Sequence, residues 1–423
     1  MARFAKPAEG SWTQHYPELG TGLVSYEDSI SPEFFELERE AIFKRVWLNV
    51  GRVEQLPRSG SYFTKELAVA KTSVVVVRDQ AGEVRAFHNI CRHRGNKLVW
   101  TDLPQQEVSG SCRQFVCKYH GWRYDLDGAC SFVQQESEFF DLDKSDYGLV
   151  PVHCQVWAGF IFVNLDRDQA CGSLREFLGP MVGALEDYPF GAMTERYVLR
   201  SEAPTNWKIF LDALQEQYHA PIVHGSARSE NFDAPMMVTG FEAPHYQLDG
   251  PHRMTTTPGY QPWTMPADKL KPLETATRSG LFGPWDPPDL GPLSAGVNPG
   301  GCDPWGNSEF VIWPNFGIQI WERGWYNTYH LWPTSYDSHV FECTHYYTPA
   351  RNASERLARQ VSVATWKEFA LQDDNLVIAL QRSLESRVVT SFPLGDQEFM
   401  CRHLHRVVAD WVDGYRRERA AAH

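Results

Sequence analysis

The sequence predicts an α+β protein with two main domains, an all-β segment over residues 47–165 and a mixed region over residues 166–423. Two observations lead to this prediction. The first segment contains β-type runs paired across turn residues, which is typical of antiparallel sheets. The second places strand-like runs before a long amphipathic helix, which is typical of helices packed on an antiparallel sheet. The length of 423 residues fits this division, because domains commonly contain about 100–200 residues.

The composition narrows the possible functions and locations. The chain carries 40 Lys and Arg against 53 Asp and Glu residues, and this net charge of −13 argues against nucleic-acid binding as the main function. No apolar run approaches the roughly 18 residues of a membrane span, and the N-terminus lacks the apolar core of a signal peptide. Because the nine cysteines are odd in number and accompany no secretion signal, we expect a cytoplasmic protein with reduced thiols.

The first elements follow from turn and capping residues. Residues 1–46 are expected to form a helical lead that packs on the later region, with Ser31 as a helix N-cap and Pro32 at the first helical position. In the all-β segment, residues 72–90 predict a hairpin with a Gln-Ala-Gly turn, and residues 152–165 predict another that turns at Ala-Gly.

The later region is predicted to contain both helices and strands. The run EAPTNWKIFLDALQEQYHA predicts a helix that ends near Pro221. The proline-rich residues 225–309 predict either several short elements or a lid over a pocket. The other predicted elements are three strand-like runs and two helices, over residues 310–321, 325–335, 339–349, 353–386 and 396–416.

Two cysteine–histidine pairs lie in turn-rich segments of the all-β region. Cys91 and His93 form a C-x-H pair, and Cys117 and His120 form a C-x-x-H pair. Two thiolates and two imidazoles suit either tetrahedral zinc or a mixed-ligand [2Fe–2S] cluster. Buried core cysteines and hydrogen-bonded histidines are the structural alternative, which two pairs in one segment make less favoured. Zinc sites usually pair cysteine with cysteine and histidine with histidine, whereas each pair here contains one of each. The [2Fe–2S] cluster is therefore favoured.

The flanking residues support an iron–sulfur site. The strings C-R-H-R-G-N and C-x-Y-H-G-W-x-Y-x-L-D-G resemble the Rieske signature. Twenty-three residues separate His93 from Cys117, more than is usual in that family, so an inserted loop is predicted over residues 101–112. Cys112 in this loop is not expected to be a ligand, because no histidine follows it at the right spacing.

A second group of possible ligands lies around residue 220. In an unbroken helix His219 and His224 would point about 140° apart, too far to share an ion. Pro221 is predicted to break the helix and let His224 turn back. The alternative is a pair of histidines that favour a helix C-terminus as cations.

A metal site with two histidines needs an anionic third ligand. In the helix over residues 353–386, Asp373 falls on the predicted apolar face, whereas Asp374 is rotated by about 100°. A carboxylate on a buried face is unfavourable unless it is paired or binds a metal. Asp373 is therefore the predicted ligand. The predicted apolar face consists of Phe369, Leu376, Val377, Leu380 and Leu384.

In this order, the two groups of residues resemble the α subunit of the Rieske non-haem iron oxygenases. The run N-W-K-x(7)-E-x-Y-H-x(4)-H, from Asn206 to His224, matches the family's mononuclear-iron motif, and Asp373 with Gln381 matches its D-x(7)-Q segment. The resemblance implies a Rieske domain over residues 47–165 and a catalytic domain of the helix-grip type over residues 166–423. Its implied cluster ligands are Cys91, His93, Cys117 and His120, and its implied Fe(II) ligands are His219, His224 and Asp373.

The resemblance also implies partners and an electron path. Family members are usually trimers, with or without a small β subunit, in which the cluster of one protomer reduces the iron of its neighbour. Glu216 would bridge a histidine ligand from each centre. Asn206 would stand near the iron, although a helix cap is the alternative. NAD(P)H is the implied electron donor, and because no G-x-G-x-x-G follows a strand, a separate flavin reductase or ferredoxin must deliver the electrons.

The implied activity is hydroxylation of an aromatic or other apolar organic substrate with O₂, as in aromatic hydrocarbon catabolism. The alternative is a monooxygenase or oxidative demethylase of an amine, such as a quaternary ammonium compound, or of an ether. Many ring dioxygenases carry aspartate at the position of Glu216, and glutamate resembles the branch that includes quaternary-ammonium demethylases. Two other interpretations are a Rieske electron carrier without catalysis and a zinc-stabilised binding protein. The carrier would not need the second group of ligands.

Overall fold

The computed structural model describes residues 11–103, 106–168, 170–224, 245–258, 272–303 and 305–421. The chain forms two compact units. The β unit consists of Ile42–Phe177, and the α+β unit consists of Met1–Ala41 and Leu178–His423. The β unit is thus slightly longer at both ends than the all-β segment expected from the sequence. Among the described residues, no helix is long and apolar enough to cross a membrane.

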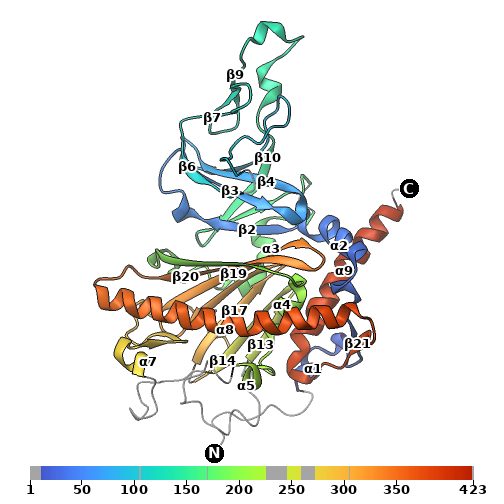
Figure 1. The fold of residues 1–423 in the computed structure, drawn as a ribbon, viewed down its shortest axis with the longest axis vertical. Coiled ribbons are helices and arrows are strands. Elements are labelled where there is room, and N and C mark those ends of the chain that lie inside the picture. The colour runs from blue at the N-terminus through green and yellow to red at the C-terminus, as the bar shows by residue number, and fades with distance from the viewer. Residues whose placement is uncertain are drawn as a thin grey trace, which may run out of the picture. The chain divides into compact units, whose positions relative to one another are not determined.

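A seven-stranded antiparallel sheet forms the base of the β unit, in the order β2-β11-β10-β5-β4-β3-β6 (Figure 1). Both predicted hairpins are present, β4 with β5 and β10 with β11. The second turns at Ala158 and Gly159, whose φ values of 48° and 82° are those that a two-residue hairpin loop favours. The strands are β2 Trp47–Arg52, β3 Ser61–Leu67, β4 Thr72–Arg78, β5 Val84–His88, β6 Ser109–Ser111, β10 Pro151–Trp157 and β11 Phe160–Asn164.

A small three-stranded sheet completes this unit and carries part of the cysteine–histidine segment. Its strands are β7 Phe115–Val116, β8 Arg123–Tyr124 and β9 Cys130–Phe132. One hydrophobic cluster joins the two sheets, because it includes Val75 and Phe87 of the large sheet and Phe115 of the small one. Cys91 and Cys117 are buried in the same cluster. The core of the β unit therefore fixes both cysteine loops.

The α+β unit is built on a second seven-stranded antiparallel sheet, in the order β12-β20-β19-β18-β17-β14-β13. The long helix α8 crosses it, and Trp366 of α8 stacks on Phe341 of β20 at 6.3 Å between ring centroids (Figure 1). This arrangement confirms the predicted fold class. The strands are β12 Glu195–Ala203, β13 His245–Asp249, β14 His252–Pro258, β17 Trp305–Ile312, β18 Phe316–Trp321, β19 Trp325–Ser335 and β20 Ser338–Tyr347.

The helices agree with several of the predicted elements. The predicted long helix over residues 353–386 is α8, Ala353–Glu385, and the last predicted helix is α9, Phe399–Ala421. The predicted strand-like run 310–321 is two strands, because the chain turns between Ile312 and Phe316. The remaining elements are α1 Ser11–His15, α2 Pro32–Glu38, α3 Leu174–Gly183, α4 Trp207–Gln215, α5 Ala220–Val223, α7 Pro272–Thr277, and the strand pairs β1 Val24–Ser25 with β21 Ser391–Phe392 and β15 Ser279–Gly280 with β16 Gly283–Pro284.

The structure differs from the sequence prediction at the end of α4 and covers only part of the proline-rich stretch. The helix that was predicted to end near Pro221 ends at Gln215, so that prediction was wrong, and Pro221 lies in the first turn of α5 instead. The proline-rich stretch 225–309 lies partly outside the described residues, at 225–244, 259–271 and 304. Its described parts contain β13, β14, α7, β15 and β16 and the start of β17, so short elements are present there.

Helix α2 is tied to helix α4 by a buried ion pair. Ser31 caps α2 as predicted, since its hydroxyl accepts the Phe34 N–H at 3.2 Å. At the other end of α2, Glu38 Oε1 lies 2.5 Å from Lys208 Nζ in the first turn of α4, and neither side chain is exposed to solvent. Burial raises the pKa of Glu38 to about 7, although Lys208 acts to lower it. Each charge is therefore unfavourable here without the other.

We expect Lys208→Met to destabilise the α+β unit because it leaves the Glu38 carboxyl buried without its partner. The expected loss is about 3 kcal/mol, which corresponds to a thermal midpoint lower by roughly 6–12 °C in a domain of this size. Thermal unfolding followed by circular dichroism measures this shift. Lys367→Met, at an exposed position of α8, is the control and should change the midpoint little. Equal midpoints for the two variants would contradict the prediction.

Candidate metal centres

The two cysteine loops of the β unit share one backbone geometry. In the first, the Gly95 N–H donates to the Cys91 carbonyl at 3.1 Å, and in the second the Gly121 N–H donates to the Cys117 carbonyl at 3.0 Å. Both glycines have positive φ values, 72° and 71°, in the region that residues with a Cβ rarely adopt. Each cysteine is therefore followed by a tight turn. The structure makes two matching loops from segments with different spacings, C-x-H and C-x-x-H.

The four predicted cluster ligands lie together at the ends of these loops. His93 Nδ1 and His120 Nδ1 are 3.1 Å apart, and both imidazoles are partly exposed. The two cysteines are buried, and burial and the neighbouring Cys117 raise the pKa of the Cys91 thiol despite a hydrogen bond from Tyr124. Sulfur donors on the inner side and nitrogen donors on the outer side suit a [2Fe–2S] cluster in which one iron has two histidine ligands.

Two aromatic residues of the same motif support these ligands. Tyr124 accepts the Arg92 backbone N–H at 3.0 Å, which leaves its own hydroxyl proton to point at Cys91 Sγ, 3.2 Å away. Trp122 stacks on the His93 ring with 5.0 Å between centroids. A hydrogen bond to a cluster sulfur raises the reduction potential of such a cluster. Sequence reasoning did not assign these roles, although both residues lie within the matched string.

Cys112 lies at the end of β6, where its N–H donates to the Gly60 carbonyl at 3.0 Å. It is half-buried, and burial raises the pKa of its thiol to about 11, so the thiol stays protonated near neutral pH. Pro104 and Gln105 of the predicted inserted loop lie outside the described residues. That Cys112 is not a ligand stays a prediction.

In the α+β unit the backbone turns sharply between the two histidines of the second group. Helix α4 ends at Gln215, and Glu216 has an extended backbone with φ −122° and ψ 148°. The Glu216 carboxylate then accepts the His219 N–H at 3.0 Å. Such a side-chain contact replaces a helical hydrogen bond, which explains why α4 stops before Pro221. The short helix α5 follows and ends next to His224.

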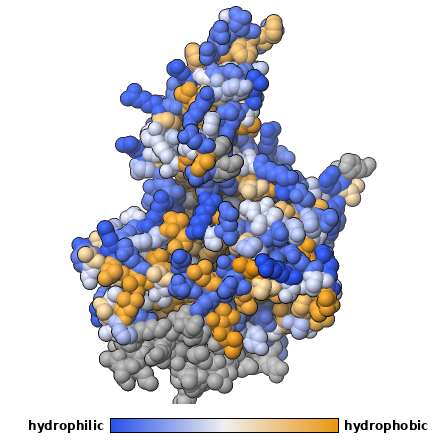
Figure 2. Space-filling view, in the orientation of Figure 1, coloured by the Kyte–Doolittle hydropathy of each residue, from blue (hydrophilic) through white to orange (hydrophobic). Residues whose placement is uncertain are grey.

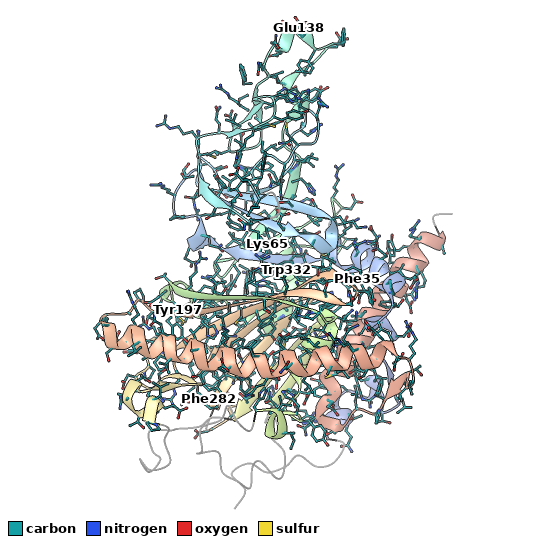
Figure 3. All side chains as sticks on the ribbon, viewed as in Figure 1. Phe35, Lys65, Glu138, Tyr197, Phe282 and Trp332 are labelled. Atoms are coloured by element: carbon teal, nitrogen blue, oxygen red, sulfur yellow. The ribbon has the colours of Figure 1, made fainter. Side chains whose placement is uncertain are left out.

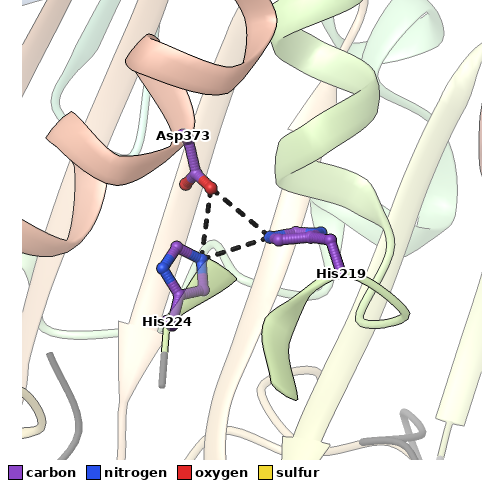
Figure 4. A group of neighbouring side chains, drawn as sticks. All are labelled: His219, His224 and Asp373. Carbon is purple, nitrogen blue, oxygen red and sulfur yellow. Dashed lines mark hydrogen bonds and ion pairs between the residues drawn. The ribbon is translucent and has the colours of Figure 1, made fainter. Parts of the chain in front are cut away.

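Asp373 of α8 meets these two histidines (Figure 4). The Nε2 atoms of His219 and His224 are 3.2 Å apart, and they lie 3.4 and 3.2 Å from Asp373 Oδ1. Three donors bound at about 2.1 Å on one face of an octahedron lie about 3.0 Å apart, so the three atoms fit one first-row metal ion. Asp373 Oδ1 is also buried without a well-aligned hydrogen bond, as expected of a ligand atom.

The outer nitrogen of each imidazole is held by an acceptor. His219 Nδ1 donates to Glu216 Oε1 at 2.5 Å, and His224 Nδ1 donates to Gln372 Oε1 at 3.0 Å. Phe369 stacks on the His224 ring at 3.6 Å between centroids. When both rings are neutral, these acceptors hold the proton on Nδ1, and each Nε2 then has its lone pair available for a metal. Gln372 was not found from the sequence, since nothing in its spacing distinguishes it from other polar helix residues.

The charges at the three donors favour metal binding. Burial lowers the pKa of His219, but the Asp373 and Glu216 carboxylates outweigh it and raise that pKa to about 10. Burial raises the pKa of Asp373, but the two histidines bring it below its usual value. Without a metal, a proton shared by these groups therefore balances the buried charge. A divalent ion would displace that proton and take over its role.

Asp373 and Asp374 differ in burial as the helix argument predicted. Asp373 is 2% exposed and groups with the two histidines, whereas Asp374 is partly buried and is not one of the three grouped donors. The predicted apolar face was partly wrong, because Leu376 and Leu380 are exposed, and Figure 2 shows that apolar side chains do reach the surface of this unit. The buried face instead includes Trp366, Ala370, Val377, Gln381 and Leu384. The residues of α8 that pack against α4 and the sheet form this buried face. It includes one polar side chain, Gln381, which makes a hydrogen bond.

That polar contact involves Asn206. The Asn206 side chain caps α4, since its Oδ1 accepts the Lys208 N–H at 2.9 Å while its Nδ2 donates to the Tyr336 carbonyl at 2.6 Å. The Asn206 N–H donates to Gln381 Oε1 at 2.8 Å. The structure thus places Asn206 in the capping position given as the alternative, and not among the described residues of the pocket at the metal donors. Gln381 joins α8 to the start of α4, so the two motifs hold each other in place.

A pocket opens at the three donors, between the helices and one face of the sheet. Part of its wall is aromatic, with side chains from α8, β18, β19 and the β15–β16 turn, among them Phe282, which is labelled in Figure 3. The sheet contributes polar side chains from alternate positions of neighbouring strands. The aromatic residues are Phe282, Trp321, Tyr329, Trp366 and Phe369, and the polar residues of the sheet are Thr257, Asn307, Glu309 and Gln319.

Comparison with known families agrees with both centres. A family model described as the Rieske [2Fe–2S] domain matches residues 46–149, and one described as the ring hydroxylating alpha subunit (catalytic domain) matches residues 190–414. The second match covers more than half of the chain. All seven predicted ligands lie within these two ranges.

Two curated relatives each match about half of the chain. The carnitine monooxygenase oxygenase subunit of Acinetobacter baumannii is 31% identical over 210 residues, 48% of this chain and 53% of that protein. The chloroplastic choline monooxygenase of Spinacia oleracea is 36% identical over 208 residues, 48% of this chain and 45% of that protein. The chain thus spans about half the length of the curated relatives it matches.

Solved structures show the same fold over nearly the whole chain. The quaternary ammonium Rieske monooxygenase CntA aligns with a TM-score of 0.71 at 19% identity, over 93% of this chain and 97% of that one. Naphthalene 1,2-dioxygenase with bound indole aligns with a TM-score of 0.68 at 19% identity, over 92% of each chain. Because both family models match, one of them over more than half of the chain, the chain belongs to the ring-hydroxylating α-subunit family, the Rieske non-haem iron oxygenases.

Proposed function

We propose that this protein is the oxygenase component of a Rieske monooxygenase that oxidises a quaternary ammonium compound. The observation that carries the proposal is the set of three donors, His219, His224 and Asp373, which face one another at 3.2–3.4 Å beside an aromatic pocket. Members of this family hold a Rieske cluster and a mononuclear iron. Iron(II) bound by these donors would supply the activation of O₂.

The substrate class is the alternative reached from the sequence, and it replaces the aromatic substrate as the preferred one. The two curated relatives are named for carnitine and choline, both quaternary ammonium compounds. Glu216 stands where many ring dioxygenases have aspartate. The aromatic wall of the pocket suits a methylated cation, because such cations are attracted to the faces of Trp, Tyr and Phe rings. Likeness to naphthalene 1,2-dioxygenase at 19% identity supports only the fold.

The proposed reaction inserts one oxygen atom into a substrate C–H bond and gives an alcohol. The second oxygen atom is reduced to water, which takes two electrons and two protons in addition to the substrate. On an N-methyl group this product would break down to formaldehyde and a tertiary amine. The electrons would come from NAD(P)H through a separate reductase, with or without a ferredoxin, and would reach the iron through the Rieske cluster.

The chain's own residues hold and orient the reacting parts. Glu216 and Gln372 fix the tautomers of the two histidines, and the Phe369 ring fixes the plane of His224. Asp373 supplies the charge that keeps a divalent ion in a buried site. The second role proposed for Glu216 is to pass electrons from the cluster of a neighbouring protomer in a trimer. Its contact with His219 provides one half of that path.

We expect Asp373→Ala to lose the mononuclear iron and all substrate oxidation while it keeps the Rieske spectrum. Iron content should fall from about three atoms per chain to about two, because the cluster ligands lie elsewhere. Metal analysis, visible absorption and product assays test this. Asp374→Ala is the matched control and should keep the third iron. If Asp374→Ala loses it and Asp373→Ala does not, the ligand assignment is wrong.

Glu216→Gln should keep both metal centres and slow electron transfer between them. An amide can still contact His219 Nδ1, but it lacks the negative charge, and changes of this kind usually lower activity by about 10–100-fold. Stopped-flow absorption of the prereduced protein, mixed with substrate and O₂, measures how fast the cluster is reoxidised. Reoxidation at the unaltered rate would show that Glu216 does not carry the electron path.

With a reductase supplied, choline should stimulate NADH-dependent O₂ uptake, and one labelled oxygen atom from ¹⁸O₂ should enter the product. The reason is the aromatic wall, which favours a methylated cation over an uncharged ring system. Naphthalene and indole are the comparison substrates. Formation of an aromatic diol, with no oxidation of any quaternary ammonium compound, would instead support an aromatic substrate.

A further inference from the structure

A carboxylate that no metal role explains lies in the wall of the same pocket. Glu309 of β17 is 4% exposed and pairs in register with Gln319 of β18. It lines the pocket together with the metal donors but comes from the sheet, whereas the donors come from the helical segments. A buried carboxylate is unfavourable unless something compensates it, so its retention in the wall of a binding pocket indicates a role.

The contacts of Glu309 leave its charge incompletely balanced. The Tyr329 hydroxyl donates a hydrogen bond to Glu309 Oε1. This is possible because Tyr329 lies opposite Gly317, where a Cβ would sit only 2.0 Å from its ring. Glu309 forms no ion pair with any residue that the structure describes. Burial raises the pKa of Glu309 to about 7, although Tyr329 and Arg253 lower it.

Arg253 is the one cation that lowers the pKa of Glu309 among the described residues, and it only partly fills the role of a permanent counter-ion. It lies on β14 beside Val311, is fully buried, and its Nη1 is 3.5 Å from His403 Nδ1. Its Nε and Nη2 atoms make no hydrogen bond within the described part of the chain. Burial lowers the pKa of Arg253 to about 10, while Asp212 acts most strongly to raise it and Glu309 adds a smaller effect in the same direction. The two groups therefore act on each other at a distance and do not form a contact.

We propose that Glu309 supplies the negative charge that binds the quaternary nitrogen of the substrate and selects a cation with an uncharged tail. The inference rests on the proposed function, since it concerns the substrate pocket of that reaction. A cation over the faces of Trp321 and Phe282 with a carboxylate at the pocket wall would have both partners that such cations favour. A betaine would also bring its own carboxylate into a pocket whose described walls already include the acids Glu216 and Glu309. Like charges at this range oppose binding.

The test compares choline with 3,3-dimethylbutan-1-ol, which replaces the trimethylammonium group by an uncharged tert-butyl group of the same shape. Glycine betaine serves as the zwitterion. With the holoenzyme and its reductase, we expect kcat/KM for choline to exceed those for the other two compounds by about tenfold or more. Glu309→Gln should remove most of this preference by lowering kcat/KM for choline while leaving kcat/KM for 3,3-dimethylbutan-1-ol unchanged. Calorimetric binding of the three compounds should show the same pattern in Kd.

The controls separate this inference from the proposed function. Glutamine can still accept the Tyr329 hydrogen bond, and continued oxidation of 3,3-dimethylbutan-1-ol would show that the variant is folded and active. Glu202→Gln, at an exposed position of β12, should leave the preference unchanged. If the wild-type protein oxidises quaternary ammonium compounds but Glu309→Gln keeps the preference for choline, the role of Glu309 is wrong. A wild-type preference for glycine betaine would overturn it as well. If the wild-type protein oxidises none of them, the proposed substrate class fails and this inference fails with it.

Discussion

The α+β unit depends on one buried group of charges, the Asp373 carboxylate between the imidazoles of His219 and His224. A carboxylate that is 2% exposed needs a cation, and the three donor atoms are spaced to share one. The segments that carry them lie about 150 residues apart in the chain, so packing alone must bring them together. The hydrogen bond from the Asn206 N–H to Gln381 fixes α8 against the start of α4, and this contact sets where Asp373 meets the histidines.

The two candidate metal centres are built in different ways. The cluster loops of the β unit each form within a few residues, where a glycine with positive φ turns the chain after a cysteine. Short strings of sequence therefore encode most of that geometry. The candidate mononuclear site combines two histidines from the broken helical segment around α5 with Asp373 from α8. The histidines are in turn held by hydrogen bonds to neighbours such as Gln372. Its geometry is a property of the folded unit.

This difference explains what the sequence could predict. Hairpins, the long helix α8 and the histidine and carboxylate candidates follow from turn residues and spacing. The end of α4 was misplaced because Pro221 is a visible breaker, whereas the side-chain contact from Glu216 to the His219 N–H that ends the helix has no such signal. The predicted buried face of α8 differs from the observed one because the observed face includes the polar Gln381, which a hydropathy pattern places at the surface. The sequence did not indicate a role for Glu309, because its place in the pocket depends on the register of β17, β18 and β19.

The same register separates the chemistry of the pocket from its selectivity. The metal donors lie on α8 and on the segment around α5, while Glu309, Trp321 and Tyr329 project from alternate positions of the sheet. A change on the sheet face can alter which substrate is held without moving a ligand. Burying the Glu309 and Tyr329 side chains is still unfavourable. The Tyr329 ring also fits only because residue 317 is a glycine, which has no Cβ to clash with it. A fold that needed only an apolar wall here would be more stable with a leucine at position 309, so the acid is best explained by what enters the pocket.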